Sequence, residues 1–323
     1  MRAQTVSLDA AAGKLLNSPI FEPSGKKLLA KGHQISAEDV RLLVSSGHSQ
    51  VSVTILEEGE VPEEDAAVQV ASESACGAME IRVAAGGRAN LFAVEDCCLL
   101  VDEEALRRVN NSGSITVATL PNLSYALAGQ RVGTVKTAPF AVPSSELAES
   151  IEYLRTRGPI LQARPIRAPA VAVLYSDPNR ADRARTLFES IMHTRLERIG
   201  VSPAFALSSL ETEEAVARSL EHLLRARPSL VLVASTTAPA GPLDVVGRAL
   251  SRAGCEIESF LAPVEPGNLL LLSYLRDIPV VAAPGCFRSP RPNVVDLILP
   301  ALLARYRLTA REISSLGHGG LLP

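Results

Sequence analysis

The sequence predicts an α/β protein in which a doubly wound, mostly parallel sheet follows a β-rich α+β domain. Two observations lead to this prediction. In the second half of the chain, wholly apolar strands such as 171–175 alternate with helices, as in parallel sheets that are covered on both faces. In the first half, short strands are separated by Gly or Asn turns, which predicts a β-rich domain with one or two short helices.

A segment rich in proline and arginine marks the expected domain boundary. Residues 158–169 (GPILQARPIRAP) contain three prolines and two arginines, a composition that favours an extended linker. The 323 residues suffice for two domains, because single cores stop growing beyond roughly 250–300 residues. We therefore predict a β-rich domain over 1–158, a linker over 159–169 and an α/β domain over 170–323. The acidic stretch 57–65 is expected to be a surface connector.

In the first domain the clearest local signal is a helix start. Ser36 is placed to cap a short helix, with Asp39 as the acid of a capping box. Val40, Leu43 and Val44 would supply its apolar face. The other elements expected here are a helix at 103–109 and strands at 51–55, 80–83, 91–94, 99–101, 115–120 and 130–137.

The second domain shows a regular alternation of strands and helices. Strands are expected at 171–175, 202–207, 230–234, 256–261 and 279–283, with a further apolar element at 269–274. Helices are expected at 183–199, 213–225, 243–253 and 292–304. Two apolar faces are predicted from the spacing: Leu187, Ile191, Leu196 and Ile199 on the first helix, and Val216, Leu220, Leu223 and Leu224 on the second.

Composition excludes several classes of function. The formal net charge of −3 supplies no positive field for nucleic acid or an anionic membrane, and the chain has no Trp and only 4% aromatic residues for base stacking. The longest apolar run, 268–274, is far short of a membrane span, and the first twenty residues lack a signal-peptide pattern. Five cysteines without CxxC spacing fit reduced thiols rather than a zinc site. We therefore expect a soluble, cytoplasmic protein.

Four loops are expected to leave the carboxyl ends of the strands, where ligands bind in such sheets. They span 175–180, 235–244, 263–268 and 284–289. Two of them precede helices and offer hydroxyl and backbone N–H groups, which attract phosphate. Arg288 and Arg291 would add positive charge. The loops predict a site for a small phosphorylated ligand.

Each of these signals also has a purely structural interpretation. Loop 235–244 is compatible with a simple connection capped by Asp244, and Pro284-Gly285 is a common exit from a buried strand. Cys286 is more often an inert apolar residue, and a lone loop carboxylate such as Glu265 is usually solvated. The sequence contains no GxGxxG, GxxxxGK[ST], HExxH or GxSxG motif. The prediction therefore depends on the four loops acting together.

The order of these loops resembles that of a known domain. A Thr- and Gly-containing loop ending in an acid (Ser235-Thr-Thr…Gly241-Pro-Leu-Asp244) is followed by a Pro-Gly loop (Pro263-Val-Glu-Pro-Gly-Asn268) and a strand ending in Pro284-Gly285. The stretch 171–300 thereby resembles the molybdopterin-binding domain of molybdenum cofactor biosynthesis proteins, which include molybdopterin molybdenumtransferases. Residues 266–272 and 283–290 look like the subgroup often fused to a cytidylyltransferase-like domain. In the first domain, 28–43, 88–92 and 115–121 are similar to the same proteins.

The resemblance implies a binding site for molybdopterin or its nucleotide-linked form. The terminal phosphate would lie against 235–237 and 284–285, Asp244 would orient hydroxyls or a metal-bound water, and Gly267-Asn268 would contact the pterin. The implied ligand-binding residues are Ser235, Thr236, Thr237, Gly241, Asp244, Pro266, Gly267, Asn268, Pro284, Gly285, Cys286 and Ser289, with Asp244 as the one candidate catalytic residue and no protein-bound metal site.

Two departures weaken the catalytic implication. The first loop reads Ser176-Asp-Pro-Asn instead of a Thr-Gly-Asp type, and Thr236-Thr237 replace an expected Gly-Gly pair, which limits how closely backbone can approach a phosphate.

Three functions stay open. The first is molybdopterin binding with molybdate insertion, using Mg²⁺ and molybdate as a molybdenumtransferase. The second is a non-catalytic carrier or scaffold for a separate nucleotidyltransferase or molybdoenzyme. The third is a domain that binds another phosphorylated metabolite. The resemblance also implies a homo-oligomer and partnership with cofactor maturation enzymes.

Overall fold

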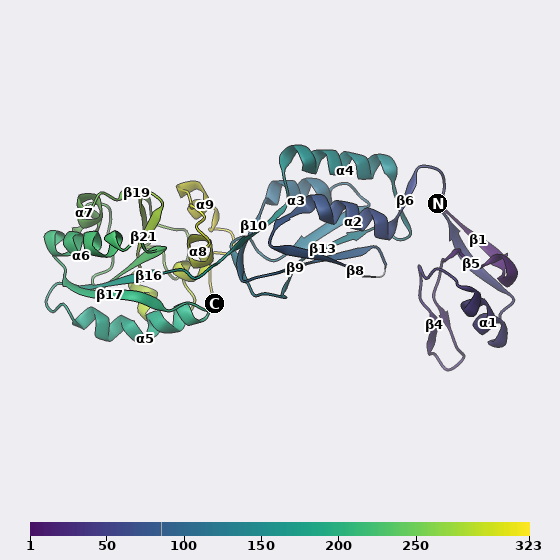
Figure 1. Ribbon diagram of the computed structural model, residues 1–323, viewed down its shortest axis with the longest axis horizontal. Helices are drawn as coiled ribbons and strands as arrows, with labels where there is room; N and C mark the ends of the chain where they lie inside the picture. Colours follow the sequence, from purple (N-terminus) through teal and green to yellow (C-terminus); the bar gives the residue numbers. More distant parts are fainter. Residues whose placement is uncertain (85) are drawn as a thin grey trace. The chain divides into compact units, whose positions relative to one another are not determined.

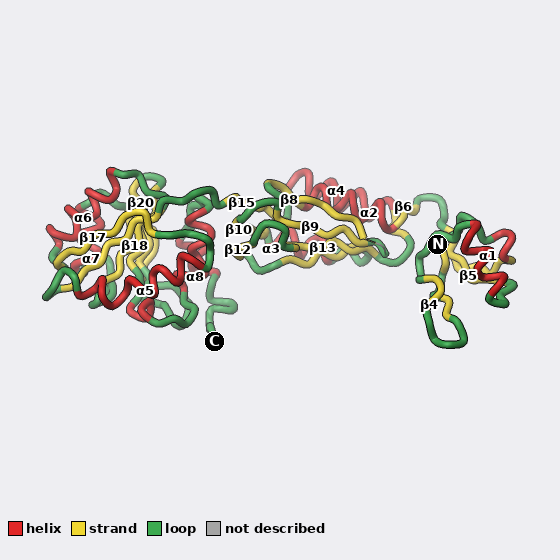
Figure 2. Tube along the Cα trace, turned by 60° about the horizontal axis from the view of Figure 1, so that its bottom comes forward, coloured by secondary structure: helices red, strands yellow, loops and turns green. Residues whose placement is uncertain are grey.

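The structure is a computed structural model that describes residues 1–84 and 86–323. Within these residues the chain divides into two compact units. The first comprises Met1–Glu95, Leu99–Asn122 and Ala126–Ala163, and the second comprises Asp96–Cys98, Leu123–Tyr125 and Arg164–Pro323. Each unit carries its own sheets and helices (Figures 1 and 2). The class is therefore mixed α/β with several sheets, some of them parallel.

A small sheet with its own core forms at the amino terminus. Its order is β1-β5-β2, with strands β1 (Arg2–Ser7), β2 (Leu15–Leu16) and β5 (Gln50–Ile55), and a hairpin of β3 (Ile20–Phe21) and β4 (Lys27–Leu29) follows β2 in the chain. Helix α1 (Ala37–Ser45) contributes Leu43 to this core, while Val44 is 58% exposed. The predicted apolar face was therefore wrong at Val44, because the helix buries only one narrow stripe.

The predicted capping box of α1 is confirmed. The Ser36 hydroxyl accepts from the Asp39 N–H, and the Asp39 carboxylate accepts from the Ser36 N–H at 2.8 Å. Burial opposes ionisation of Asp39, but hydrogen bonds from Ser36 and His33 outweigh it and lower its pKa to about 2.

The main sheet of the first unit is antiparallel and has the order β11-β13-β9-β8. Its strands are β8 (Met79–Ala84), β9 (Arg88–Ala93), β11 (Ile115–Thr119) and β13 (Arg131–Thr137), all close to the predicted positions. Helices α2 (Glu63–Ser74) and α4 (Ser144–Arg157) lie over one face of it (Figure 1). Neither helix was predicted. The expected surface connector at 57–65 is wrong, because it contains strand β6 (Glu60–Pro62) and the acidic first turn of α2.

The remaining elements of this region are shorter. Helix α3 (Glu103–Asn110) matches the helix predicted at 103–109. The Asp102 carboxylate, just before it, caps its first turn. Strand β14 (Ala141–Pro143) pairs with β6. A four-stranded sheet contains β12 (Ser124–Ala126), β10 (Cys97–Val101), β15 (Leu161–Pro165) and β7 (Ala75–Gly77). Strand β15 lies inside the segment 159–169 that the composition predicts to be a linker, and it pairs in parallel with β7.

The second unit is built on a six-stranded mixed sheet of order β17-β16-β18-β21-β20-β19. Strands β17 (Pro203–Leu210), β16 (Val171–Asp177), β18 (Leu230–Ser235) and β21 (Ile278–Ala282) are parallel to one another. Strand β20 (Leu271–Leu275) runs antiparallel to both of its neighbours: β21, to which a two-residue turn joins it, and β19 (Glu256–Phe260) at the edge. The parallel prediction therefore holds for four strands.

Helices lie on both sides of this sheet. Helix α5 (Arg183–Glu197) lies on one side, and α6 (Glu213–Arg225) and α7 (Val245–Arg252) lie on the other (Figure 1). Helix α6 coincides with its prediction and buries the four expected residues. Helix α8 (Val294–Leu303) and the short α9 (Ala310–Ser315) end the unit.

The predicted inner face of α5 was partly wrong. Leu187 is 48% exposed, and the buried side instead carries Ala184, Phe188, Met192 and Arg195. An arginine on that side interrupts the apolar spacing on which the prediction depended. Along the described residues, no helix is both long and apolar enough to cross a membrane.

Candidate site at the carboxyl edge of the parallel strands

A buried glutamate organises the hydroxyls of the predicted phosphate loop. Glu211 follows β17, is 8% exposed, and accepts from the Ser176 hydroxyl at 2.9 Å and from the hydroxyls of Ser235 and Thr237. The Ser176 and Ser235 backbones are paired across β16 and β18, so the sheet register places both hydroxyls beside one carboxylate. These hydroxyls are consequently used inside the protein as donors.

A second carboxylate holds the third hydroxyl. Asp177, at the end of β16, is fully buried, and one oxygen accepts from the Thr236 hydroxyl at 2.6 Å. Its other oxygen accepts from the backbone N–H groups of Asn179 and Arg180 at 2.8 and 2.9 Å. The Thr236 hydroxyl is the main reason that the pKa of Asp177 lies below its usual value, with the two N–H groups and the Arg183 guanidinium acting in the same direction against the opposing effect of burial. Asp177 therefore ties loops 175–180 and 235–244 together.

Asp244 is the cap of helix α7. One carboxylate oxygen accepts from the Gly247 N–H at 2.6 Å and the other from the Ala240 N–H at 2.5 Å. A Cβ on Gly247 would lie 2.4 Å from the Pro242 carbonyl, so the loop folds tightly over the first turn of the helix. Both oxygens of the candidate catalytic residue are thus occupied by backbone donors, as in the structural interpretation of this loop.

The last loop is held from beneath by a buried arginine. Arg195 of α5 is 2% exposed and donates to the Arg291 carbonyl at 2.9 Å, to the Ser289 carbonyl, and to the Asp296 carboxylate of α8. Its guanidinium also lies 4.9 Å from the centroid of the Phe287 ring. This single side chain positions the segment that carries Pro284, Gly285, Cys286 and Ser289.

Loop 284–289 contains a short 3₁₀ helix, η2 (Gly285–Arg288), that begins after Pro284. Among the described residues, no backbone carbonyl accepts from the N–H groups of Gly285 and Cys286, and the Cys286 N–H donates to its own thiol. Burial raises the pKa of the Cys286 thiol, so this residue is not an activated nucleophile. Arg288 and Arg291 are exposed at the surface.

The Pro-Gly loop approaches the start of α8 very closely. A Cβ on Gly267 would lie 2.7 Å from the Val294 side chain and 2.9 Å from the Val294 nitrogen, and its φ of +127° also favours glycine. Asn268 is exposed, and its carbonyl accepts from the Ala262 N–H at 2.9 Å. The C-terminal segment pairs with this loop, because the Glu265 N–H donates to the Gly320 carbonyl at 2.7 Å.

The structure therefore brings the predicted loops together at one edge. Thr236 contacts Asp177, Gly285 lies 3.4 Å (from an ideal Cβ) from the Ala238 side chain, and Gly267 packs on Val294. Ser235, Thr236 and Thr237 are turned towards the two carboxylates, and Gly241, with φ +156°, lies near Phe260. Pro266 follows a cis peptide bond in the Pro-Gly loop.

Three important residues of this edge were not predicted. Glu211 lies in a Leu-Glu-Thr-Glu-Glu stretch, where it looks like one more acid at a helix start. Asp177 was noted only as part of a loop, and Arg195 only as part of a helix. One available signal was position, since Asp177 ends β16 and Glu211 directly follows β17 in the parallel part of the sheet.

The two carboxylates do not form a site suited to Mg²⁺. Magnesium prefers oxygen ligands that are free to coordinate it in octahedral geometry, whereas all four oxygens here accept from protein donors. In the part of the chain that the structure describes, no group of three or more His, Cys, Asp or Glu could hold a metal ion. No metal-dependent step is therefore derived.

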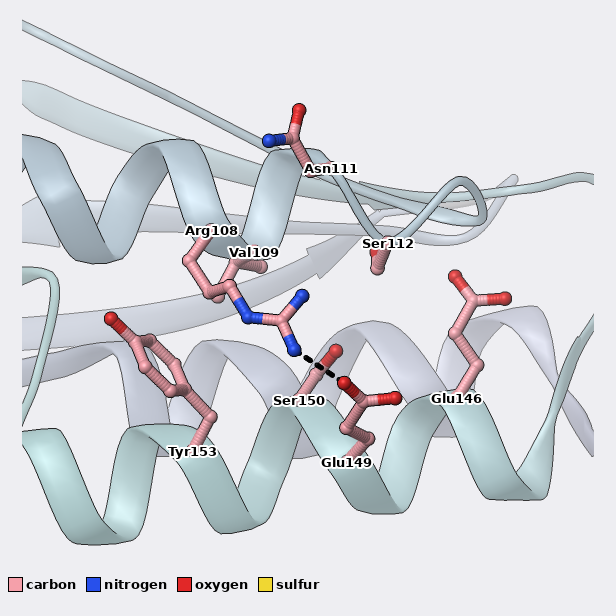
Figure 3. A pocket seen from close by; sticks show the side chains of 8 residues that line it. All are labelled: Arg108, Val109, Asn111, Ser112, Glu146, Glu149, Ser150 and Tyr153. Carbon is pink, nitrogen blue, oxygen red and sulfur yellow. Dashed lines mark hydrogen bonds and ion pairs between the residues drawn. The ribbon is translucent and has the colours of Figure 1, made fainter.

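A separate small cavity lies in the first unit, between α3 and α4 (Figure 3). Its volume is about 150 Å³, and Arg108 reaches across it to pair with Glu149, with Tyr153 on the same helix beside them. Glu146 is occupied by the N–H and hydroxyl of Ser114, at 2.7 and 2.8 Å. With its charges paired internally, this cavity offers little to a ligand.

Comparisons with known proteins give only distant likenesses. No protein-family model matches the sequence, and no curated protein matches it. Similar solved structures include a molybdopterin biosynthesis MoeA protein from Pyrococcus horikoshii, with 11% identity, a TM-score of 0.34, and coverage of 96% of this chain and 76% of that one. A molybdenum cofactor biosynthesis protein from Pyrococcus furiosus has 12% identity and a TM-score of 0.26, covering 94% of this chain and 64% of that one.

A further MoeA structure from Pyrococcus horikoshii has 11% identity and a TM-score of 0.25, over 94% of this chain and 74% of that one. Likenesses with identities and TM-scores this low do not by themselves indicate a function.

Proposed function

We propose that the α/β unit binds molybdopterin, or its nucleotide-linked form, at the carboxyl edge of β16, β18 and β21, and so takes part in molybdenum cofactor biosynthesis in the cytoplasm. The observation that carries the proposal is the convergence of loops 175–180, 235–244 and 284–289 at this edge, with 263–268 packed on the helix that follows. The order of those loops is the feature by which the sequence resembles molybdopterin-binding domains. In this proposal the sheet is a doubly wound variant with an antiparallel edge.

The phosphate of the ligand is held by backbone groups in this proposal. The hydroxyls of Ser235, Thr236 and Thr237 already donate to Glu211 and Asp177, and two carboxylates beside them would repel a phosphate. The Gly285 N–H has no backbone acceptor and the Cys286 N–H faces only its own thiol, and an anion accepts from such groups readily. The hydroxyl loop then supports the site, and Pro284 to Cys286 bind the phosphate.

The pterin is assigned to the neighbouring Pro-Gly loop. Pro266, Gly267 and Asn268 lie on it, and the absence of a Cβ at Gly267 keeps the loop against Val294. Asn268 is exposed and offers its side-chain amide to the polar edge of a pterin.

A carrier or scaffold fits this edge better than a molybdenumtransferase. A residue that acts as a base or orients a water needs a free oxygen, but both oxygens of Asp244 accept backbone N–H groups. We therefore propose that the protein holds molybdopterin for a separate nucleotidyltransferase or molybdoenzyme. Expression in a strain deficient in molybdenum insertion separates the two functions, since a carrier leaves molybdoenzyme activity absent and a transferase restores it.

Binding of molybdopterin to the purified chain tests the site directly. Gly285→Ala should weaken binding, because the added methyl limits how closely a phosphate approaches the backbone, while its 3.4 Å contact with Ala238 is ordinary packing that leaves the loop in place. Asp244→Asn and Thr236→Ala test whether these two side chains contact the ligand or only support the loop. Asparagine can still cap helix α7, so a loss of affinity in Asp244→Asn would indicate a contact with the ligand. Glu197→Gln, at the exposed end of α5, removes the same charge outside both sites and is the matched control. Affinity unchanged in Gly285→Ala would remove the assigned phosphate site.

A rival ligand is another phosphorylated metabolite. It would compete with molybdopterin for the same N–H groups but would not need Asn268. Binding that falls with Gly285→Ala and is unaffected by Asn268→Ala would favour the rival over a pterin. Size-exclusion chromatography with light scattering tests the expected homo-oligomer.

A further inference from the structure

The second unit carries a second concave surface at the opposite end of its sheet, which we call the arginine groove. It is an open cavity of about 1120 Å³ beside the turns that lead into β18 and β21. Its walls include Arg225, Arg227, Arg276, Arg305 and Arg307. Against these five cations the lining has only two acids, Glu221 and Asp277. The excess of positive charge is local, because the whole chain has a net charge of −3.

Most of this charge is not neutralised within the protein. Among the residues that the structure describes, the guanidinium groups of Arg225, Arg227, Arg276 and Arg305 form no ion pair. Unpaired like charges around one concavity repel each other, and an anion placed among them removes that repulsion.

Arg307 is held in place at one side of the groove. Its guanidinium lies 4.1 Å from the centroid of the Tyr274 ring, donates to the Arg276 carbonyl at 2.9 Å, and faces Glu258 at 3.4 Å. A stacked and hydrogen-bonded guanidinium loses less freedom when it meets a ligand than a mobile one does.

Three of the arginines have a backbone conformation that usually favours glycine. The φ angles are +49° at Arg227, +55° at Arg276 and +55° at Arg305. Arg227 and Arg305 follow the carboxyl ends of α6 and α8, where a cation also complements the helix dipole. Arg276 lies in the two-residue turn between β20 and β21, where no helix end accounts for its charge. Strained positions that retain a charged side chain are typical of binding sites.

We propose that the arginine groove binds a small ligand that carries two or more linked phosphate groups, as in inorganic pyrophosphate or a nucleoside diphosphate. Guanidinium groups bind phosphate oxygens in paired hydrogen bonds, and several of them around one cavity match a ligand with several anionic oxygens. The volume suits a ligand of nucleotide size. This site is separate from the proposed molybdopterin site and does not depend on it.

Isothermal titration calorimetry with inorganic pyrophosphate tests the proposal. The wild-type chain should bind it, with an affinity that falls as salt is raised. Arg225→Gln combined with Arg276→Gln should weaken binding by about tenfold or more. Arg198→Gln removes an exposed arginine outside the groove and should bind as wild type does. A loss confined to Gly285→Ala would assign pyrophosphate to the other edge and overturn the proposal.

Arg276→Gly separates a binding role from a structural one. Glycine relieves the positive φ, so this variant should unfold at a higher temperature than wild type while losing pyrophosphate affinity. Affinity unchanged in both Arg276 variants, no binding by the wild type, or binding of an acidic peptide in place of pyrophosphate would each overturn the proposal. Tighter binding of ADP than of pyrophosphate would identify the ligand as a nucleotide, and equal binding would identify the diphosphate as the whole recognised group.

Discussion

The two ends of the mixed sheet treat their polar groups in opposite ways. At the carboxyl edge, Asp177 and Glu211 are buried and every carboxylate oxygen has a protein donor. At the amino end of β18 and β21, four arginines surround a cavity without forming an ion pair among the described residues. The carboxylates and hydroxyls of the first edge therefore satisfy one another, whereas the charged side chains at the second are open to an external anion.

This difference separates two kinds of polar cluster that look alike in a sequence. Hydroxyls and acids at strand ends are usually interpreted as ligand-binding groups, but here their hydrogen bonds hold loops 175–180 and 235–244 together. Four exposed arginines that converge on one cavity, with no ion pair among the described residues, are the stronger sign of a site for an anion. The following changes would break or sharpen this comparison, from the largest expected effect to the smallest.

Loss of Arg195 should have the largest effect on stability. Arg195→Ala removes the partner of Asp296 and of three loop carbonyls, and breaking a buried pair costs about 3–5 kcal/mol. Denaturant unfolding would measure the loss. Arg195→Lys should recover little of it, because one ammonium cannot replace the planar fork. A loss as small as that of the exposed control Arg198→Ala would contradict the assigned role.

Removal of Glu211 should have the next largest effect. Glu211→Ala leaves the hydroxyls of Ser176, Ser235 and Thr237 without their shared acceptor, at a cost of about 2–3 kcal/mol. Glu211→Gln keeps one acceptor oxygen and should lose less. Equal stability of the alanine variant and wild type would show that these hydroxyls are not the contacts that hold the edge.

At the other end of the sheet, replacing an arginine of positive φ by glycine should stabilise the fold. Arg305→Gly replaces an arginine at φ +55° and should raise the free energy of unfolding by about 1 kcal/mol. The matched control is Arg198→Gly, at a right-handed helical position, which should lower it. Destabilisation by Arg305→Gly would mean that the guanidinium has a structural partner.

The smallest expected effect is a change in stability that is present only at acidic pH. Because hydrogen bonds lower the pKa of Asp177 in the folded chain, its contribution is complete above the unfolded value of about 3.9 and is lost as the pH falls through the folded value. Thermal unfolding of Asp177→Asn should therefore depend less on pH below about 4 than that of wild type. Parallel curves for the two proteins would rule out Asp177 as a source of acid sensitivity.

Local patterns predicted much of the fold but missed helices α2, α4 and α9. The capping box at Ser36, helix α6 and the buried strands β16 and β18 follow from signals within a few residues. Helix α2 was missed because its acidic first turn, which suits a helix amino terminus, looked like a solvated charge run. Strand β15 was not predicted because its composition is that of a linker. It is a strand because it pairs with its neighbours in the sheet, among them β7.

At the candidate site, the sequence predicted which loops would meet but not what they would do. The parallel arrangement of β16, β18 and β21 brings their carboxyl ends to one edge, so their convergence follows from the topology. The roles of the hydroxyls depended on Glu211, which is 24 residues from Ser235 in the chain and adjacent to it only through the sheet. The hydrophobic periodicity of the sequence gives no indication of such a contact.

The sequence by itself determined the alternation of strands and helices in the second unit, because burial on both faces requires continuous apolar strands and 3.6-residue spacing requires amphipathic helices. Only the tertiary structure decided that Ser235 to Thr237 donate inward to carboxylates and that Arg195 lies beneath the last loop. The arginine groove also emerged only in three dimensions, since its cations come from three separate segments of the chain. The physical reason is that charge and hydrogen bonding act through space, while a sequence pattern reports only neighbours along the chain.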